Sequence, residues 1–274
     1  MDTLIKMLSL PFIVRALVVG LLVSLCAALL GVSLVLKRYS MIGDGLSHVG
    51  FGALAVATAT RTAPLVVAIP VVVAAAFLLL RLSVNSRIRG DAAIALISTG
   101  SLAVGVTAIS VTSGMNTDVY NYMFGSVLSI SAGDVTLSIA LTAVVLALFV
   151  LCYNKIFAVA FDEEFARATG VNAGFFNSVS AFLTAVTIAL GIRVMGALLI
   201  SSLIIFPALT STRVCKRFLS ATICSAAVSA ACFLAGVVIS FAAGTPTGAS
   251  VVVANIAVFL AFWTVSIIRK AWGR

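Results

Sequence analysis

Two side chains within one apolar stretch could bind a metal ion. The sequence contains a single histidine, His48, and Asp44 precedes it by four residues. Residues spaced by four share one face of an α-helix, with their Cβ atoms roughly 5–6 Å apart. A helix here would present a carboxylate and an imidazole side by side. Zinc, manganese and iron all accept these two ligand types.

The residues alone leave two interpretations of this pair open. Ionisable groups inside a membrane span are costly and mark functional sites by default, and two ligands would suit an ion that must be released. The alternative is structural: Asp44 caps the helix and His48 forms a hydrogen bond to a neighbouring helix. Glycines on both sides of the pair would let other backbones approach closely: Gly43, Gly45, Gly50 and Gly52.

The elements that must position these residues are membrane-spanning helices. Of 274 residues, 62% are hydrophobic and only 9% are charged, whereas a soluble domain carries about 25% charged residues. This composition excludes a soluble globular enzyme and a disordered chain. The apolar runs predict an all-α polytopic membrane protein, a single domain over residues 1–274 with a bundle of about nine spans: 12–36, 45–60, 64–80, 92–113, 135–153, 176–192, 196–212, 219–243 and 249–268. Because few residues separate 176–192 from 196–212, eight spans are the alternative.

Lysine and arginine are distributed unevenly between the predicted loops. With nine spans, one set of loops holds 13 of the 17 basic residues: Lys37, Arg38, Arg81, Arg87, Arg89, Lys155, Arg167, Arg213, Lys216, Arg217, Arg269, Lys270 and Arg274. Basic loops face the cytoplasm, so this set and the C-terminus are predicted to be cytoplasmic. The net charge of +9 is then explained by topology and by anionic lipid in the bilayer, and it calls for no nucleic-acid partner.

The longest predicted cytoplasmic loop, about 155–174, contains a candidate helix. Three acids, Asp162, Glu163 and Glu164, precede Arg167, which is the charge order that a helix dipole favours. Gly170 can adopt the left-handed conformation that ends helices. We therefore expect a short exposed helix over 162–170, with an ordinary solvated loop as the alternative. A second segment, 114–134, is aromatic and long enough for a short re-entrant or surface helix.

Signatures of enzymes are missing from the sequence. It has no His-Glu-x-x-His motif and no phosphate-binding loop with its lysine, so we expect neither a zinc protease nor nucleotide hydrolysis by this chain. The five cysteines form no Cys-x-x-Cys pair and are interpreted as apolar packing residues.

In order along the chain, these features resemble the permease subunit of the ABC importers for zinc, manganese and iron(II), the ABC-3 family. The segment 31–38 followed by Gly43-Asp44-Gly45-Leu46-Ser47-His48 is similar to the most diagnostic stretch of the family. Further segments that fit the family pattern are 11–17, 91–94, 122–126, 194–199, 206–208 and 246–249.

The resemblance implies a permease in the bacterial cell (inner) membrane that forms a homodimer around a central path. Two cytoplasmic ATPase subunits would bind ATP, and an extracellular metal-binding protein would deliver the cargo. Asp44 and His48 would contact the metal in transit, with no permanently bound cofactor. The helix over 162–170 would couple to the ATPases through Asp162, Glu163, Glu164, Ala166, Arg167 and Gly170.

The cargo and the depth of the site are the open points. The pattern favours zinc, with manganese or iron(II) as alternatives, and other classes are an ABC permease for a metal chelate or an autonomous channel or secondary carrier. The predicted span 45–60 leaves Asp44 near the cytoplasmic end. A span that starts near Met41 would carry Asp44 deeper into the membrane.

Overall fold

A computed structural model describes residues 11–85, 90–112 and 132–272 of the chain. Over these residues the protein is all α-helical, as predicted. Within these ranges ten helices follow one another: α2 (Pro11–Leu36), α3 (Ser40–Ala59), α4 (Pro64–Asn85), α5 (Gly90–Thr112), α7 (Ala132–Phe161), α8 (Glu163–Ala168), α9 (Ala173–Met195), α10 (Ala197–Val214), α11 (Phe218–Ala243) and α12 (Thr247–Trp272). The segment predicted at 114–134 lies almost wholly outside the described residues, as do Arg87 and Arg89.

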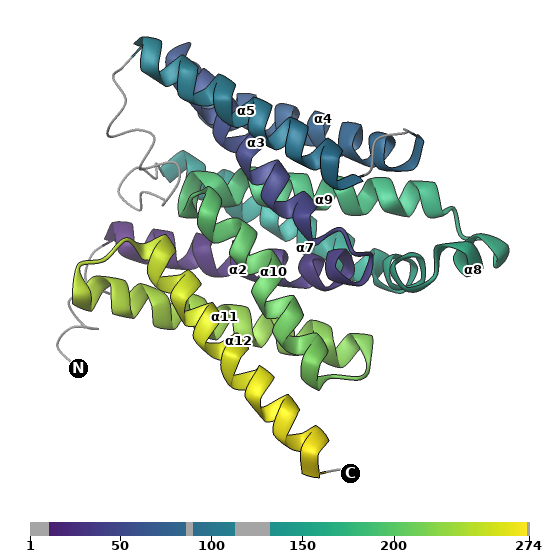
Figure 1. Ribbon diagram of the computed structural model, residues 1–274. Helices are drawn as coiled ribbons and strands as arrows, with labels where there is room; N and C mark the ends of the chain where they lie inside the picture. The colour runs from purple at the N-terminus through teal and green to yellow at the C-terminus, as the bar shows by residue number, and fades with distance from the viewer. Residues whose placement is uncertain (1–10, 86–89, 113–131, 273–274) are drawn as a thin grey trace.

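Each predicted span corresponds to one long helix, and successive long helices run in alternate directions (Figure 1). The helices α9 and α10 are separate and meet at Gly196, whose φ of 84° only glycine adopts readily. Eight of the described helices are long and apolar enough to cross a membrane. Among the long helices of the described part, α3 is the one that falls short in apolarity, and it carries Asp44 and His48.

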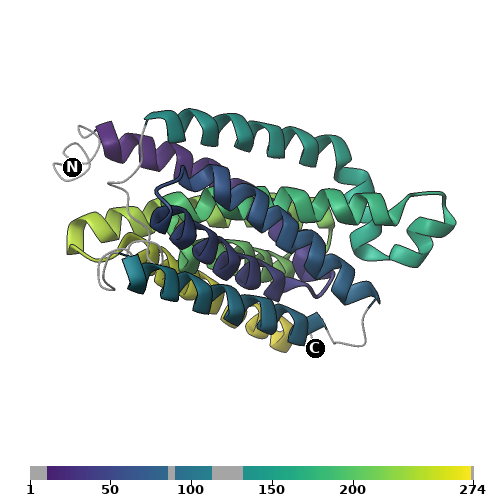
Figure 2. The same cartoon turned by 90° about the horizontal axis from the view of Figure 1, so that it is seen from above.

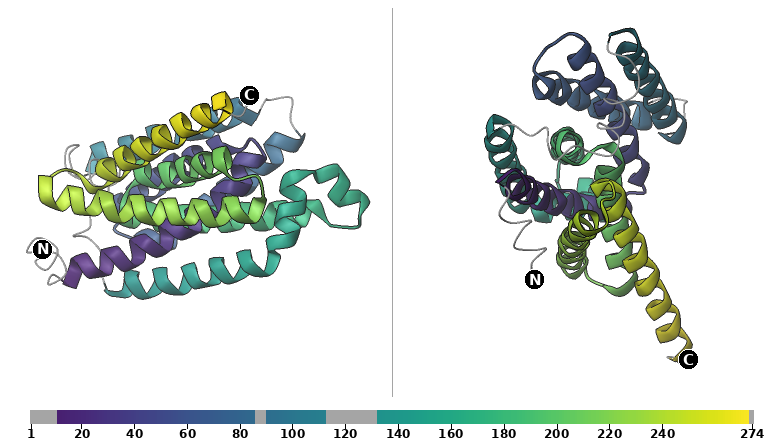
Figure 3. Two further views of the ribbon diagram at one scale, coloured as in Figure 1. Left: turned by 90° about the horizontal axis from the view of Figure 1, so that it is seen from below. Right: turned by 90° about the vertical axis from the view of Figure 1, so that its left-hand side faces the viewer.

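The helices form one bundle with its core along the inner faces of α2, α3, α4, α9 and α10. Seen end-on, α3, α4 and α5 gather on one side and α10, α11 and α12 on the other (Figure 3). The helices α5 and α12 are the least buried of the apolar spans: only 17% of the residues in the most apolar part of each are buried within the protein. Their outer faces suit lipid, because a helix in a bilayer needs no polar exterior.

The two ends of the bundle differ in charge. The short helix α8 projects at one end, which we call the α8 end, and the start of α2 and the end of α12 lie at opposite ends (Figure 1, Figure 2). Among the described side chains, the helix ends at the α8 end carry Lys37, Arg38, Arg81, Lys155, Arg167, Arg213, Lys216 and Arg217. The opposite end carries Arg15, Arg61 and Arg193.

The helices α3 and α5 pack unusually closely because glycines face each other. A Cβ atom at Gly52 would lie 2.5 Å from the carbonyl oxygen of Ser101, and one at Gly105 would lie 2.8 Å from the Cα of Gly52. Small residues at such positions allow the backbone-to-backbone approach that stabilises membrane helix pairs. The position of α3 is therefore determined largely by its contact with α5.

Candidate metal-permeation site and coupling helix

Helix α3 carries both predicted metal ligands within its first half. It begins at Ser40, and its N-cap residue Tyr39 makes no side-chain cap hydrogen bond. Asp44 thus lies in the second turn of the helix and does not cap it, contrary to the structural alternative. The early start also agrees with a span that begins near Met41.

The two side chains face each other without satisfying each other. His48 Nε2 lies 3.7 Å from Asp44 Oδ2, which is longer than a hydrogen bond. The side chains of His48 and Asp44 are 26% and 42% exposed. His48 Nδ1 is buried and has no hydrogen-bond partner. Since buried polar atoms are nearly always paired, this ring nitrogen is an exception that calls for an explanation.

A pocket of about 220 Å³ opens beside the pair. Helix α3 supplies Asp44, Ser47, His48 and Phe51, α5 supplies Leu102, and α10 supplies Ala197, Leu198 and Ser201. Leu102 is close to the midpoint of α5, so the pocket reaches the middle of that helix, while Asp44 lies one turn from the start of α3. Three helices therefore enclose the two ionisable groups.

The pocket offers few other ligands for a metal ion. Across the described residues, no group of three or more His, Cys, Asp or Glu side chains could hold a metal. The Ser47 hydroxyl donates to Asp44 O at 2.7 Å and the Ser201 hydroxyl to Ala197 O at 2.9 Å, so both are engaged within their own helices. One carboxylate and one imidazole in an open pocket would contact an ion without trapping it, because a closed tetrahedral site needs four ligands.

Helix α8 forms where the sequence predicts a short exposed helix. Asp162 is the N-cap, and its Oδ1 accepts a hydrogen bond from Phe165 N at 2.9 Å. The helix ends before Gly170, which has a φ of 84°, and Val171 N donates back to Ala166 O at 2.9 Å. Left-handed glycine after a helix with this backward hydrogen bond is the Schellman cap.

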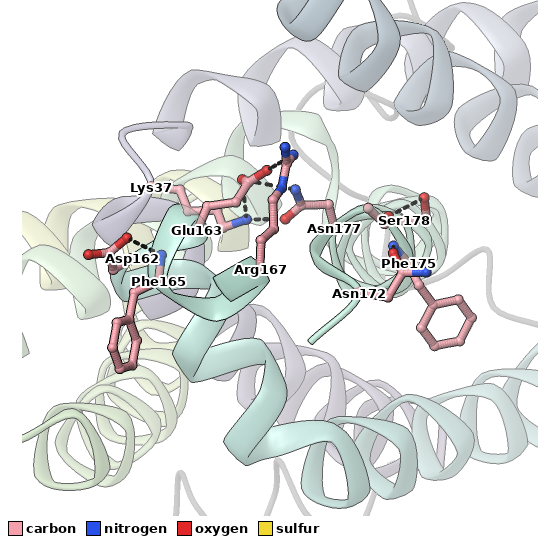
Figure 4. Close-up of polar contacts among 10 residues, drawn as sticks. Lys37, Asp162, Glu163, Phe165, Arg167, Asn172, Phe175, Asn177 and Ser178 are labelled. Carbon is pink, nitrogen blue, oxygen red and sulfur yellow. Dashed lines mark hydrogen bonds and ion pairs between the residues drawn. The ribbon is translucent and has the colours of Figure 1, made fainter. Parts of the chain in front are cut away.

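The residues of α8 fall into an inner and an outer set. Ala166 is fully buried against Val159 and Ala173 and anchors the helix to α7 and α9. Asp162, Glu164 and Gly170 are exposed at the end of the bundle, and the exposed Arg167 turns toward Glu163. Phe165, 66% exposed, points to the opposite side of α8 from Arg167, near Asp162 (Figure 4).

Glu163 has the opposite orientation and is surrounded by three polar partners (Figure 4). Its carboxylate accepts hydrogen bonds from Arg167 at 2.5 Å and from Asn177 Nδ2 at 3.1 Å, and Lys37 Nζ lies 3.8 Å away. Lys37 Nζ also donates to Asn177 Oδ1. Helix α8 is thus connected both to α9 and to the turn between α2 and α3.

The charges in this cluster shift each other's protonation. Burial alone would raise the pKa of Glu163, but the hydrogen bond from Asn177 and the charges of Lys37 and Arg167 lower it. Burial lowers the pKa of Lys37, and the Glu163 charge opposes that shift. Glu163 is therefore ionised at neutral pH and neutralises an ammonium group with little access to water.

Sequence reasoning did not identify Lys37, Asn177 or Phe165 as functional residues. Lys37 was one of many basic loop residues, and Asn177 is 140 residues away from it in the chain. No local spacing indicates such a contact. Of the three, only Phe165 could have been recognised from the sequence, because a large apolar side chain within a charged segment marks a possible interaction site.

Comparison with known proteins agrees with the fold and with the order of the motifs. Residues 9–266 match the model of the ABC 3 transport family. The high-affinity zinc uptake system membrane protein ZnuB of Haemophilus influenzae is 27% identical over 245 residues, which cover 89% of this chain and 94% of that protein. The manganese transport system membrane protein MntC of Halalkalibacterium halodurans is 26% identical over 260 residues, 94% of this chain and 89% of that protein.

A solved structure has the same fold. PsaBC from Streptococcus pneumoniae, determined in complex with a Fab, superposes with a TM-score of 0.85 at 24% identity and covers 96% of this chain and 94% of that chain. Since the family model spans nearly the whole sequence, the chain belongs to the ABC 3 transport family, as a transport component rather than an enzyme.

Proposed function

We propose that this chain is the membrane permease subunit of an ATP-driven importer of divalent transition-metal ions, zinc in particular. The observation that carries the proposal is the pair Asp44 and His48, which faces a pocket between α3, α5 and α10 inside an otherwise apolar bundle. An imidazole nitrogen with a carboxylate oxygen suits zinc, and it suits the harder manganese less well. Relatives named for zinc and for manganese leave both metals as the natural test substrates.

The size of the pocket favours a metal ion without a chelator, rather than a metal chelate, as cargo. Its volume of about 220 Å³ is below the roughly 300–1,000 Å³ of sites for small organic ligands. A hydrated or partly dehydrated ion needs only a few donors and room for water. The separation of 3.7 Å between His48 Nε2 and Asp44 Oδ2 is too long for a hydrogen bond, so these two atoms can each accept an ion.

The assembly that we propose takes its subunits from the family and its orientation from the polarity of the bundle. Two copies would form a homodimer in the bacterial inner membrane, with the α8 end and the C-terminus in the cytoplasm, as the basic residues at that end favour. Two ATPase subunits would dock against α8, where Phe165 offers an exposed aromatic anchor near the exposed acids Asp162 and Glu164. A metal-binding protein would deliver the ion to the opposite face. ATP-driven rocking of the two permeases would then expose the pocket to each side in turn.

Metal uptake by cells that depend on this transporter tests the proposal. Zinc and manganese accumulation would be compared for the wild type, Asp44→Ala and His48→Ala, at equal amounts of protein in the membrane. Ser201→Ala is the matched control, because Ser201 lines the same pocket but its hydroxyl is bonded within α10. We expect both ligand variants to lose uptake and the control to retain it. Normal uptake of both metals by both ligand variants would contradict the assignment of the site.

A further inference from the structure

The side chains around Glu163 connect the candidate coupling helix α8 with the turn that leads into the helix of the candidate metal ligands. On one side is α8, at the tip of the bundle; on the other is the turn that connects α2 to α3, the helix with Asp44 and His48. The contact is made by Lys37, the first residue after α2, whose Nζ lies 3.8 Å from Glu163 Oε2. Asn177 on α9 binds both partners, with its Oδ1 toward Lys37 and its Nδ2 toward Glu163.

This contact is firmer than an ordinary surface ion pair. Exposed pairs are screened by water and contribute little, whereas a buried charge that loses its partner is left uncompensated. The Lys37 side chain is only 13% exposed. Its ammonium group therefore depends on Glu163 and Asn177, and separating α8 from the turn would strand that charge.

The turn itself has little slack with which to absorb a movement. Arg38 has a left-handed φ of 60°, and Tyr39 N donates back to Leu34 O at 2.9 Å. Ile42 N then donates to Tyr39 O at 3.0 Å in the first turn of α3. The backbone amides of Lys37, Arg38 and Tyr39 all donate back to the end of α2, and Ile42 of α3 donates to Tyr39. The end of α2, the turn and the start of α3 are thus joined by hydrogen bonds, so we expect a displacement of Lys37 to shift the start of α3.

The distance from the turn to the candidate metal ligands is short. Ser40 starts α3 three residues after Lys37, and Asp44 follows after one further turn of helix. At a rise of about 1.5 Å per residue, Asp44 lies roughly 6 Å along the helix from Ser40. Because a helix is stiff over such a length, the position of Asp44 follows the position of the turn.

From this geometry we infer that Lys37 is a positioning residue that ties α8 to α3 through Glu163 and Asn177, so that a displacement of α8 is transmitted to Asp44 and His48. The inference rests on the proposed function, in which the ATPases move α8. Glu163 then differs from the other acids of α8: Asp162 and Glu164 lie on the outer surface, whereas Glu163 passes the movement inward. Breaking this joint should leave ATP hydrolysis running while less metal is moved for each ATP.

The test uses the complete transporter, permease with its ATPase subunits, in proteoliposomes with zinc and manganese as substrates. Metal uptake and ATP hydrolysis are measured on the same sample to give the number of ions moved per ATP. We expect Lys37→Met and Glu163→Gln each to lower this ratio at least fivefold while the ATPase subunits still co-purify. Lys37→Arg, which keeps the charge, should restore most of the ratio. Asn172→Ala is the matched control, because it removes a cap hydrogen bond to Phe175 N in the same region and leaves the joint intact.

The possible outcomes separate this inference from the proposed function. An unchanged ratio in Lys37→Met and Glu163→Gln would overturn the inference and leave the metal importer standing. Loss of the ATPase subunits from Glu163→Gln during purification would also overturn it, since Glu163 would then serve docking instead of transmission. If Lys37→Met fails to fold, Lys37→Arg and Glu163→Gln still give the ratio. A wild-type complex that hydrolyses ATP without moving either metal would refute the proposed function itself.

Discussion

Helices α3 and α8 hold the two polar clusters on which the proposals depend, and the clusters are built in opposite ways. On α3, Asp44 and His48 are 3.7 Å apart and His48 Nδ1 has no partner. On α8, the carboxylate of Glu163 is contacted by three side chains from three different elements. The first cluster faces an open pocket and is unsatisfied, whereas the second is satisfied and holds an ammonium group whose side chain is only 13% exposed.

The difference indicates what each cluster is for. A buried polar atom without a partner costs free energy, and a protein tolerates it where a ligand supplies the missing contact. A fully paired network specifies one geometry and resists change. The α3 pair therefore has the features of a transient binding site, and the Glu163 cluster has those of a mechanical joint.

The largest effect that would test this comparison is a loss of transport without a loss of stability. Asp44→Asn should reduce metal uptake by at least about a hundredfold, because ligand changes exceed the 10–100-fold effects of residues that only orient ligands. Its free energy of unfolding should change by less than about 0.5 kcal/mol, since the part of the chain that the structure describes makes no hydrogen bond to the Asp44 side chain. Uptake and thermal unfolding in detergent measure the two quantities. If Asp44→Asn had a lower melting temperature than Glu163→Gln, Asp44 would have a structural role instead.

The second effect concerns how α3 is held in place. Gly52→Ala should destabilise the protein by about 1–3 kcal/mol, because the new methyl group would overlap the carbonyl oxygen of Ser101 at 2.5 Å. Gly100→Ala on α5 is the matched control: no atom lies within 4 Å of its Cβ position. The control should be neutral or stabilising by up to about 1 kcal/mol. Equal melting temperatures for the two variants would argue against the close α3–α5 contact.

A smaller effect compares the ends of the two helices. Both end in a left-handed residue, which is Gly170 after α8 and Arg61 after α3. A side chain in this conformation costs roughly 1–2 kcal/mol per residue. Gly170→Ala should therefore destabilise the protein by about 1 kcal/mol, and Arg61→Gly should stabilise it by a similar amount, as measured by chemical unfolding. Changes of the same sign in both variants would contradict the shared cap geometry.

The smallest effect is a pH dependence at the joint. The pKa of Glu163 lies below its ordinary value of 4.5 in the folded protein, so its contribution to stability is full above that value and is lost as the pH falls through the lowered pKa. The difference in melting temperature between the wild type and Glu163→Gln should be constant from pH 8 to about pH 5 and shrink below about pH 4. A difference that grows on acidification would mean that the carboxylate is destabilised in the fold.

Much of the fold follows from local sequence signals. Long apolar runs predict the spanning helices because a bilayer imposes both their length and their composition. The acids before Arg167 and the glycine at 170 predict α8 because dipole and cap interactions act over one turn of helix. The spacing of Asp44 and His48 predicts a shared face for the same reason. Each of these features depends on residues that are close together in the chain.

The contacts between distant residues could not be predicted in this way. The residues of α5 and α10 that line the pocket are brought there by helix packing. The apolar faces of different helices have similar compositions, so the sequence does not indicate which faces will meet. Likewise Lys37 and Asn177 meet only because the end of α2 lies beside the start of α9. The buried position of Ala166 was equally hidden, since a six-residue helix is too short to show a periodic apolar face.

The modest apolarity of α3 has a consequence for how the protein is made. A segment with an aspartate and a histidine in its first half is a poor substrate for independent insertion into a bilayer. Only Lys37, Arg38 and Tyr39 separate it from α2, which is strongly apolar. We therefore expect α3 to enter the membrane as the second arm of a hairpin with α2 and to settle only when α5 has been synthesised. During biogenesis, the helix that carries the proposed metal ligands would thus reach its final position only after the helices that pack against it have been inserted.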